Sequence, residues 1–225
     1  MQQRSRFLIA VLLGVSPVFA QGQAAPGPEP SPAPSHPTST PYTGDLSRFD
    51  YPERDARLQP QRILSLLGVR AGSSIADLGA GGGWLTVRAA RRVGSDGVVF
   101  AEDINPAAIK TIRDRAEREH LPQVRAVLGL PDDPKLPPRS VDAVVILKTY
   151  HEIAHTNLLL RNLIPALRPG AKLGIIDRNG NGANHGLNEA IVVREVEDAG
   201  FRKVGRYDFT KADGEDYFLI FERIH

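Results

Sequence analysis

A chain of 225 residues with 41% hydrophobic and 24% charged residues has the composition of one globular domain, with or without added segments. It contains no cysteine, which excludes disulfide bonds, thiolate zinc sites and a cysteine nucleophile. The formal net charge of +2 raises the question of a nucleic-acid partner, and the answer depends on where the charges lie.

Residues 1–20 have the pattern of a secretory signal. Arg4 and Arg6 precede an apolar run over residues 7–15, which is too short to span a membrane, and the small residues near Ala20 favour cleavage after it. We therefore expect an exported protein, periplasmic or secreted. The alternative is a disordered or loosely membrane-associated N-terminus. Cleavage would remove two of the 28 Lys and Arg residues and none of the 26 acidic ones, so the mature chain is expected to be neutral, with no nucleic-acid partner.

Residues 21–45 contain seven of the eighteen prolines of the chain. A segment of this composition buries too little apolar surface to fold, so a disordered, Pro-rich tether is predicted. We expect a single domain over residues 46–225, which is a usual domain size.

The remaining sequence alternates between helical and strand patterns. This alternation predicts an α/β domain with a doubly wound parallel sheet, whose ligands bind beyond the carboxyl ends of the strands. Two closing strands have no helix between them and are expected to pair antiparallel. Helices are expected at 56–68, 84–93, 106–120, 156–167 and 189–199, and strands at 74–78, 97–101, 124–128, 141–147, 172–177, 203–209 and 216–222.

The strongest motif follows the first predicted strand. Asp77 lies in that strand, and Gly79, Gly81 and Gly83 follow before a helix begins at Trp84. Glycines let the backbone approach a ligand closely, and a helix N-terminus offers free N–H groups. The spacing D-x-G-x-G-x-G differs from the dinucleotide fingerprint, which needs glycine where Trp84 stands, and from the phosphate-binding loop, which needs Gly-Lys-Ser/Thr.

Two acids end the next strand. Glu102 and Asp103 lie about twenty residues after the glycine motif, where a carboxylate is suited to hold a ribose diol. Either acid fits, and Asp103 is preferred because the residues directly after it open a helix. A lone acid at this place is more often a solvated residue or a helix cap, and its pairing with the glycine motif favours nucleoside binding.

Six segments in the chain share their order with one protein family. They are DLGAGGG (77–83), AEDINPAAI (101–109), SVDAVVILKTYHEI (140–153), LRPGAKLGIIDRNG (167–180), EVEDAGF (195–201) and YFLIFER (217–223). Together they resemble the class I S-adenosylmethionine-dependent methyltransferases. The resemblance implies a Rossmann-like fold with a seven-stranded sheet in the order 3-2-1-4-5-7-6, strand 7 antiparallel, and S-adenosylmethionine as the cofactor.

The resemblance also implies which residues bind the cofactor. The glycines would approach its methionine and adenosine portions, the first acid would fix the loop, and the second acid would hold the ribose with an isoleucine on the adenine. Family members commonly carry an acid or amide directly after strand 3 for the adenine amine, whereas the acids here come later. The residues assigned in this way are Asp77, Gly79, Gly81, Gly83, Asp103, Ile104 and Asp132.

Polar residues follow the fourth strand, toward which the transferred methyl group is expected to point. Tyr150 and His151 are the predicted catalytic residues, with His151 as a general base, since an imidazole titrates near neutral pH. The alternative is that His151 and Glu152 cap the next helix or bond within the sheet edge.

The loop over residues 178–186 is rich in Gly and Asn and contains His185. We expect it to be a lid over the acceptor, with a plain flexible connection as the alternative. No metal site is predicted, because His120, His155 and His225 show no metal-ligand spacing.

The predicted function is in-line methyl transfer from S-adenosylmethionine to a small-molecule acceptor. A nucleic-acid base is disfavoured because no Asn/Asp-Pro-Pro-Tyr/Phe segment follows the fourth strand. Export would separate the chain from a cofactor made in the cytoplasm, so the second hypothesis is a non-catalytic binding protein on the same scaffold. The third is a nicotinamide-dependent oxidoreductase, which Trp84 opposes.

Overall fold

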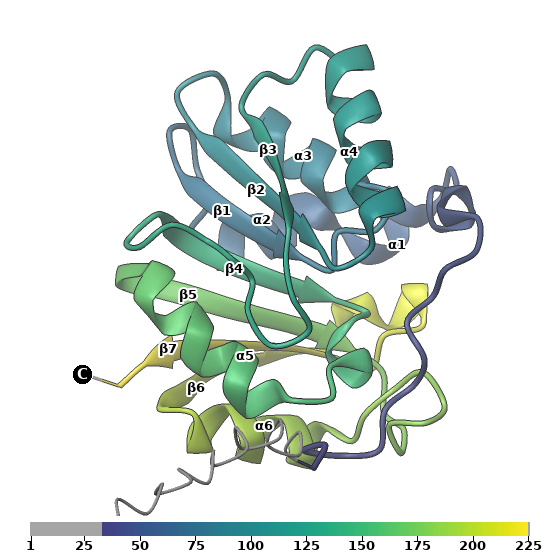
Figure 1. Cartoon of the computed structure of the whole chain (residues 1–225), viewed down its shortest axis with the longest axis vertical. Coiled ribbons are helices and arrows are strands. Elements are labelled where there is room, and N and C mark those ends of the chain that lie inside the picture. Colours follow the sequence, from purple (N-terminus) through teal and green to yellow (C-terminus); the bar gives the residue numbers. More distant parts are fainter. Residues whose placement is uncertain (1–32, 225) are drawn as a thin grey trace, which may run out of the picture. The chain divides into compact units, whose positions relative to one another are not determined.

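The computed structural model describes residues 33–224 of the chain. The predicted signal over residues 1–20 and the first part of the predicted tether lie outside the described residues. The described part is an α/β domain in which a central sheet carries helices on both faces (Figure 1). Among its helices, none is both long enough and apolar enough to cross a membrane.

The sheet has seven strands in the order β3-β2-β1-β4-β5-β7-β6. Strands β1 to β5 are parallel, and β7 pairs antiparallel with both β5 and β6. This confirms the predicted order and the antiparallel closing pair. The strands are β1 (Ser74–Leu78), β2 (Val98–Asp103), β3 (Val124–Leu128), β4 (Val141–Leu147), β5 (Leu167–Asp177), β6 (Phe201–Tyr207) and β7 (Tyr217–Arg223).

The helices follow the predicted alternation, but the helix expected over 156–167 ends at Leu163 and another expected helix is divided. The helix expected over 56–68 is two short helices, because Gln59 adopts a φ of 52° and Pro60 begins a new helix. The α-helices of the described part are α1 (Arg54–Leu58), α2 (Pro60–Leu66), α3 (Trp84–Val93), α4 (Pro106–Arg118), α5 (Thr156–Leu163) and α6 (Glu189–Asp198). The 3-10 turns include η2 (Tyr150–Glu152) and η4 (Phe209–Asp213).

Alternate residues of the central strands pack into two separate cores. On one face, Ile75 and Val145 pack with α2 and α3. On the other face, Val144 and Leu173 pack with α5 and α6. Because both faces of the central strands are covered in this way, the carboxyl ends of the strands are the place where polar side chains converge.

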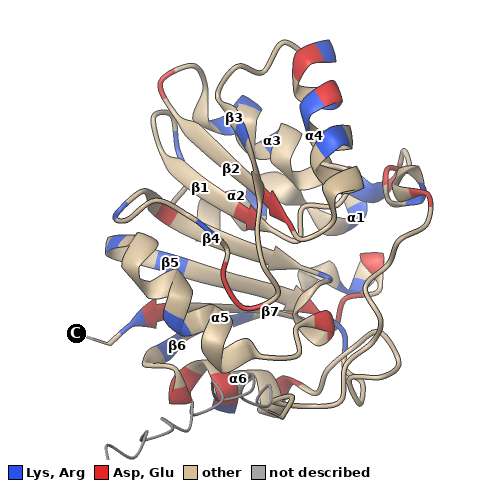
Figure 2. Ribbon diagram, viewed as in Figure 1, with Lys and Arg blue, Asp and Glu red and all other residues tan. Residues whose placement is uncertain are grey.

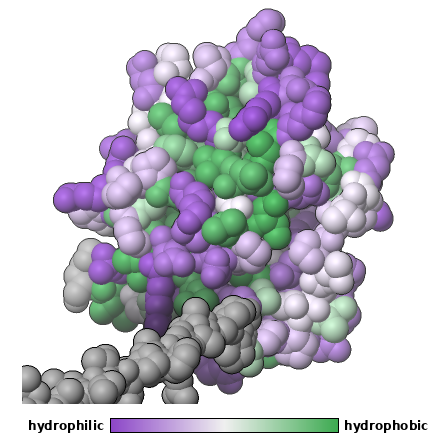
Figure 3. Space-filling model, viewed as in Figure 1, coloured by the Kyte–Doolittle hydropathy of each residue, from purple (hydrophilic) through white to green (hydrophobic). Residues whose placement is uncertain are grey.

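The connection from β3 to β4, residues 129–140, contains no helix. One side of β2 and β3 is therefore incompletely covered, and Leu128 and Leu130 are exposed. Figure 3 shows apolar surface in this upper part of the domain. A neighbouring helix in this layer would have buried such side chains.

Residues 33–45, here called the strap, differ from the predicted disordered tether. The strap has no regular secondary structure, yet its His36 and Ser39 are buried. The N–H of Ser35 donates to the carbonyl of Ala154 at 2.7 Å, and the hydroxyl of Ser39 donates to the carbonyl of Gly182 at 2.6 Å. The Pro-rich composition gives no periodicity from which such packing is predictable, because an extended segment attaches through its backbone and a few polar side chains.

Candidate functional site

The glycine loop between β1 and α3 is the centre of the candidate site. Gly79, Gly81 and Gly83 have φ angles of 70°, 55° and 75°, in the left-handed region that other residues rarely adopt. The loop is also tightly packed, since a Cβ atom at Gly79 would lie 2.3 Å from Thr149 Cγ2. Position 79 therefore requires glycine for two separate reasons, and the N-terminal N–H groups of α3 follow directly.

The two acids at the end of β2 have different surroundings, and Figure 2 shows acidic residues at this end of the strand. The half-buried Asp103 accepts hydrogen bonds from the N–H groups of Gly81 and Asn105, both at 2.9 Å. Glu102 is buried, and its Oε2 accepts from the N–H of Gly79 at 3.4 Å. Asp103 is therefore the acid that a ligand on the glycine loop can reach.

The buried carboxyl group of Glu102 favours its protonated form. Removal from water raises the pKa of Glu102 to about 8, and the nearby Asp103 and Asp77 carboxylates raise it as well. Only the N–H of Gly79 acts in the opposite direction among the main causes. The folded chain therefore keeps a proton on Glu102 at neutral pH.

Glu102→Gln is expected to remove part of the pH dependence of folding stability. Between the ordinary pKa of 4.5 and the folded value of about 8, the folded chain holds a proton that the unfolded chain has released. Rising pH therefore lowers the free energy of unfolding of the wild type through this window, by a few kcal/mol at roughly 1.4 kcal/mol per pKa unit. Glutamine has no such proton, so the variant should lose less stability than the wild type between about pH 5 and about pH 8. Urea unfolding at these two pH values measures the loss.

The matched control for this measurement is Glu117→Gln, because Glu117 is exposed on α4. Its loss of stability between the two pH values should equal that of the wild type. If Glu102→Gln also loses as much stability as the wild type, Glu102 does not hold the extra proton.

Asp77 joins the end of β1 to the first turn of α3. Its Oδ2 accepts a hydrogen bond from Thr86 Oγ1 at 2.7 Å. Burial raises the pKa of Asp77 to about 6, although the Thr86 hydroxyl and the Arg54 guanidinium oppose that shift. The contact ties together the two elements that enclose the glycine loop.

The two residues assigned to the adenine lie in different settings. Ile104, directly after Asp103, is 42% exposed, which gives a flat aromatic ring an apolar surface to pack on. Asp132 lies in the β3–β4 connection, and its backbone carbonyl accepts a hydrogen bond from Asn162 Nδ2 at 2.8 Å. The carboxylate of the next residue, Asp133, is held by Lys135 at 2.7 Å.

The ends of β4 and β5 bring His151 and Asp177 together. The carboxylate of the buried Asp177 lies 2.8 Å from His151 Nδ1 and also accepts the backbone N–H groups of His151 and Arg178. An ionised carboxylate only accepts hydrogen bonds, so Nδ1 carries the proton and Nε2 has the free lone pair. The sequence motif predicted a role for His151 but did not reveal Asp177 as its partner.

Tyr150 differs from its prediction as a catalytic residue. Its side chain is fully buried, and its hydroxyl donates to Glu195 Oε2 on α6 at 3.1 Å. Thr156 donates to the same oxygen, and His36 of the strap lies 2.9 Å from the other. The turn η2 directs Tyr150 into the core under α6 and His151 toward β5, so the Tyr150 hydroxyl does not reach the strand ends where His151 lies.

Three residues from the two segments that follow β4 and β5 lie together in the structure. Side-chain ligand atoms of His151, Glu152 and His185 are all within 4.8 Å of one another. The two imidazole rings meet edge to face, with 5.9 Å between their centroids. Burial raises the pKa of Glu152 to about 7. The signal that predicts this grouping is the strand order alone, because adjacent parallel strands β4 and β5 end at the same edge.

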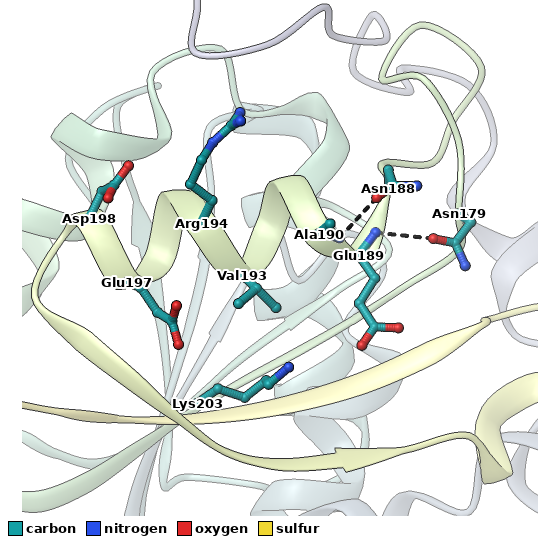
Figure 4. A pocket seen from close by; sticks show the side chains of 9 residues that line it. All are labelled: Asn179, Asn188, Glu189, Ala190, Val193, Arg194, Glu197, Asp198 and Lys203. Atoms are coloured by element: carbon teal, nitrogen blue, oxygen red, sulfur yellow. Dashed lines mark hydrogen bonds between the residues drawn. The ribbon is translucent and has the colours of Figure 1, made fainter.

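The structure also has a surface groove beside α6 (Figure 4). It has a volume of about 540 Å³ and is formed by α6, β6 and the residues before α6. The groove includes none of the residues assigned to cofactor or acceptor. The charged side chains that line it are Glu189, Arg194, Glu197, Asp198 and Lys203.

Residues 75–170 match the family described as a methyltransferase domain. The ubiquinone/menaquinone biosynthesis C-methyltransferase UbiE of Marinomonas sp. strain MWYL1 is 30% identical over 122 residues, which cover 54% of this chain and 49% of that protein. The UbiE protein of Idiomarina loihiensis matches to the same extent. The chain thus spans about half the length of the curated relatives it matches.

Solved structures share the fold over most of the chain. A SAM-dependent methyltransferase from Aquifex aeolicus has a TM-score of 0.73 and 22% identity, covering 81% of this chain and 100% of that one. Geranyl diphosphate C-methyltransferase from Streptomyces coelicolor A3(2), solved with Mg²⁺, geranyl diphosphate and S-adenosyl-L-homocysteine, has a TM-score of 0.62 and 16% identity, covering 84% and 91%. The fold is that of the class I methyltransferases, and the matches support S-adenosylmethionine as the cofactor.

Proposed function

We propose that the protein transfers a methyl group from S-adenosylmethionine to a small-molecule acceptor. The observation that carries this proposal is the half-buried Asp103 carboxylate bonded to the N–H of Gly81, at the glycine loop of a matched methyltransferase domain. The small-molecule class of the acceptor is supported by the UbiE relatives, which are C-methyltransferases of ubiquinone and menaquinone biosynthesis.

The residues present suit this cofactor. A carboxylate with free acceptor positions at Asp103 is able to hold both ribose hydroxyls, and the exposed Ile104 is able to cover one face of the adenine. The left-handed glycines leave the loop backbone open to close approach. The buried Trp84 opposes a dinucleotide, because it packs between the guanidinium groups of Arg54 and Arg88 where the fingerprint has its third glycine.

When bound, S-adenosylmethionine supplies a methyl group that its positively charged sulfur activates. The acceptor's electron pair would form the new bond to the methyl carbon as the carbon–sulfur bond breaks and a neutral thioether leaves. The residues of this chain contribute alignment and exclusion of water. Thr149 connects the glycine loop with the segment that contains His151, since it packs on Gly79 and His151 follows two residues later. We place the acceptor beside His151, whose Nε2 is suited to either of two roles, to take a proton or to bind a cation.

Asp103→Ala is expected to weaken binding of S-adenosylmethionine and of S-adenosyl-L-homocysteine by about 100-fold or more, because two hydrogen bonds to the ribose are lost. Hydrogen bonds to a charged group contribute roughly 1.5–3 kcal/mol each, and roughly 1.4 kcal/mol corresponds to a tenfold change. Both ligands carry the same ribose, so both should lose affinity equally. Calorimetric titration measures the two dissociation constants.

The matched control is Asp114→Ala, which removes an exposed carboxylate from α4. Its affinity for both ligands should equal that of the wild type. Unchanged affinity in Asp103→Ala would place the ribose elsewhere, and no binding of either ligand to the wild type below about millimolar would remove the proposed function.

A further inference from the structure

We propose that His151, Glu152 and His185 form a binding site for one divalent transition-metal ion. The three residues come from the segments that follow β4 and β5, and their ligand atoms lie within 4.8 Å of one another. The position of this site deepens the function proposed above, since it lies where the acceptor is placed.

The spacing of the ligand atoms is near that of a coordinated ion. His151 Nε2 lies 3.9 Å from Glu152 Oε1. Two ligands of a tetrahedral zinc ion, each at about 2.1 Å, are separated by about 3.4 Å. A rotation of the partly exposed Glu152 and His185 side chains closes the remaining distance, while the buried His151 stays in place.

Asp177 gives His151 the arrangement of a metal ligand. A ligating histidine usually donates its other ring N–H to a carboxylate, which fixes the tautomer and makes the coordinating nitrogen more basic. His151 donates Nδ1–H to Asp177 at 2.8 Å and has only a few per cent of its side chain exposed. Among the described residues, its Nε2 has no hydrogen-bond partner, and Glu152 Oε1 is 3.9 Å away.

The backbone of His185 is fixed on both sides of the residue. Its N–H donates to Ser39 Oγ of the strap at 2.8 Å, and its carbonyl accepts from Arg178 Nε at 2.6 Å. These bonds hold the backbone of His185 at a φ of 58°, and its ring lies 5.9 Å from the His151 ring between centroids. A general base would need His151 alone, whereas a metal site gives His185 and Glu152 a role as well.

The donor set selects the class of ion. Two imidazoles and one carboxylate suit zinc, iron, cobalt or nickel, whereas magnesium and calcium prefer oxygen ligands throughout. Three protein ligands leave at least one coordination position open, which is typical of sites where a metal holds a reacting molecule. On the proposed function, the ligand for that position is an oxygen atom of the acceptor.

The test is a pair of titrations of the full, chelator-treated chain. Binding of Co²⁺ is measured by the visible absorption of the bound ion, and binding of Zn²⁺ is measured by calorimetry. The wild type should bind one equivalent of either ion, with a tetrahedral or five-coordinate Co²⁺ spectrum. His185→Ala and Glu152→Gln should each lose the spectrum and weaken binding by more than the roughly 10- to 100-fold that follows loss of a second-shell partner. Both positions are partly or fully exposed, so neither variant removes a core side chain.

His120→Ala is the matched control, because His120 is exposed in the turn after α4 and outside the cluster, and it should bind both ions as the wild type does. Absence of one-equivalent binding tighter than about millimolar would overturn the proposal. So would binding that persists in the double variant of Glu152 and His185. Binding of S-adenosyl-L-homocysteine in the same preparation separates the two proposals, since it tests the proposed function without the metal.

Discussion

Gly79→Ala is expected to abolish measurable binding of S-adenosylmethionine and to lower the free energy of unfolding by about 2–5 kcal/mol. The φ of 70° at this position costs an L-residue roughly 1–2 kcal/mol. The added Cβ would also lie 2.3 Å from Thr149 Cγ2 and 2.5 Å from its Oγ1, and overpacking of this kind costs roughly 1–3 kcal/mol. Relief of the clash moves the loop away from Thr149, so the binding surface is lost. Calorimetric titration and urea unfolding measure the two effects.

Gly214→Ala separates the backbone effect from the clash. Gly214 has a left-handed conformation, with a φ of 90° and a ψ of 10°, and a Cβ there would have nothing within 4 Å. This variant should lose only about 1–2 kcal/mol of stability and keep the affinity of the wild type. Equal losses of stability in Gly79→Ala and Gly214→Ala would show that contact with Thr149 does not constrain the glycine loop.

The glycine loop was predictable because its causes are local. A buried strand, three glycines and a helix start within about ten residues leave few other structures for the segment. The predicted strands 74–78, 124–128 and 141–147 agree with β1, β3 and β4 to the residue. The resemblance to a family then supplied the strand order, which hydrophobic patterns alone do not contain.

The strap was not predictable by the same means. Its prolines exclude a helix and a central strand, so the composition indicates an extended segment. The composition does not indicate which residues that segment contacts. In the structure, Ser39 exchanges hydrogen bonds with Gly182 and His185, about 140 residues later in the chain. Neither segment has a hydrophobic periodicity, so the sequence pattern does not predict the contact between them.

The pairing of His151 with Asp177 and His185 lies between these cases. Parallel pairing of Leu147 with Ile176 places the segments after β4 and β5 side by side, so the strand order predicts that they meet. It does not predict that η2 sends Tyr150 into the core and His151 toward the strand end. Side-chain direction in a single 3-10 turn depends on packing against α6, which lies far along the chain.

Asp177→Ala is expected to lower the free energy of unfolding by about 3–5 kcal/mol. Its carboxylate is buried and accepts from the His151 ring, the His151 backbone and the Arg178 backbone. Truncation leaves these three donors without their acceptor, and each buried donor that loses its acceptor costs roughly 1–3 kcal/mol. Urea unfolding measures the loss. Asp142→Ala is the control, because its carboxylate is bonded to Arg168 and to the N–H of Ser74 but is 39% exposed, and it should lose about 1 kcal/mol.

Asp177→Asn separates folding from positioning. The amide keeps the size of the side chain and one acceptor oxygen, so this variant should retain most of the stability that Asp177→Ala loses. It no longer offers a full negative charge to His151 Nδ1–H, so the free Nε2 becomes less basic and its ring less firmly oriented. Zn²⁺ affinity should therefore fall by about 10- to 100-fold while urea unfolding changes far less than in the alanine variant. A variant as unstable as Asp177→Ala, or one that binds Zn²⁺ as tightly as the wild type, would show that Asp177 serves the core alone.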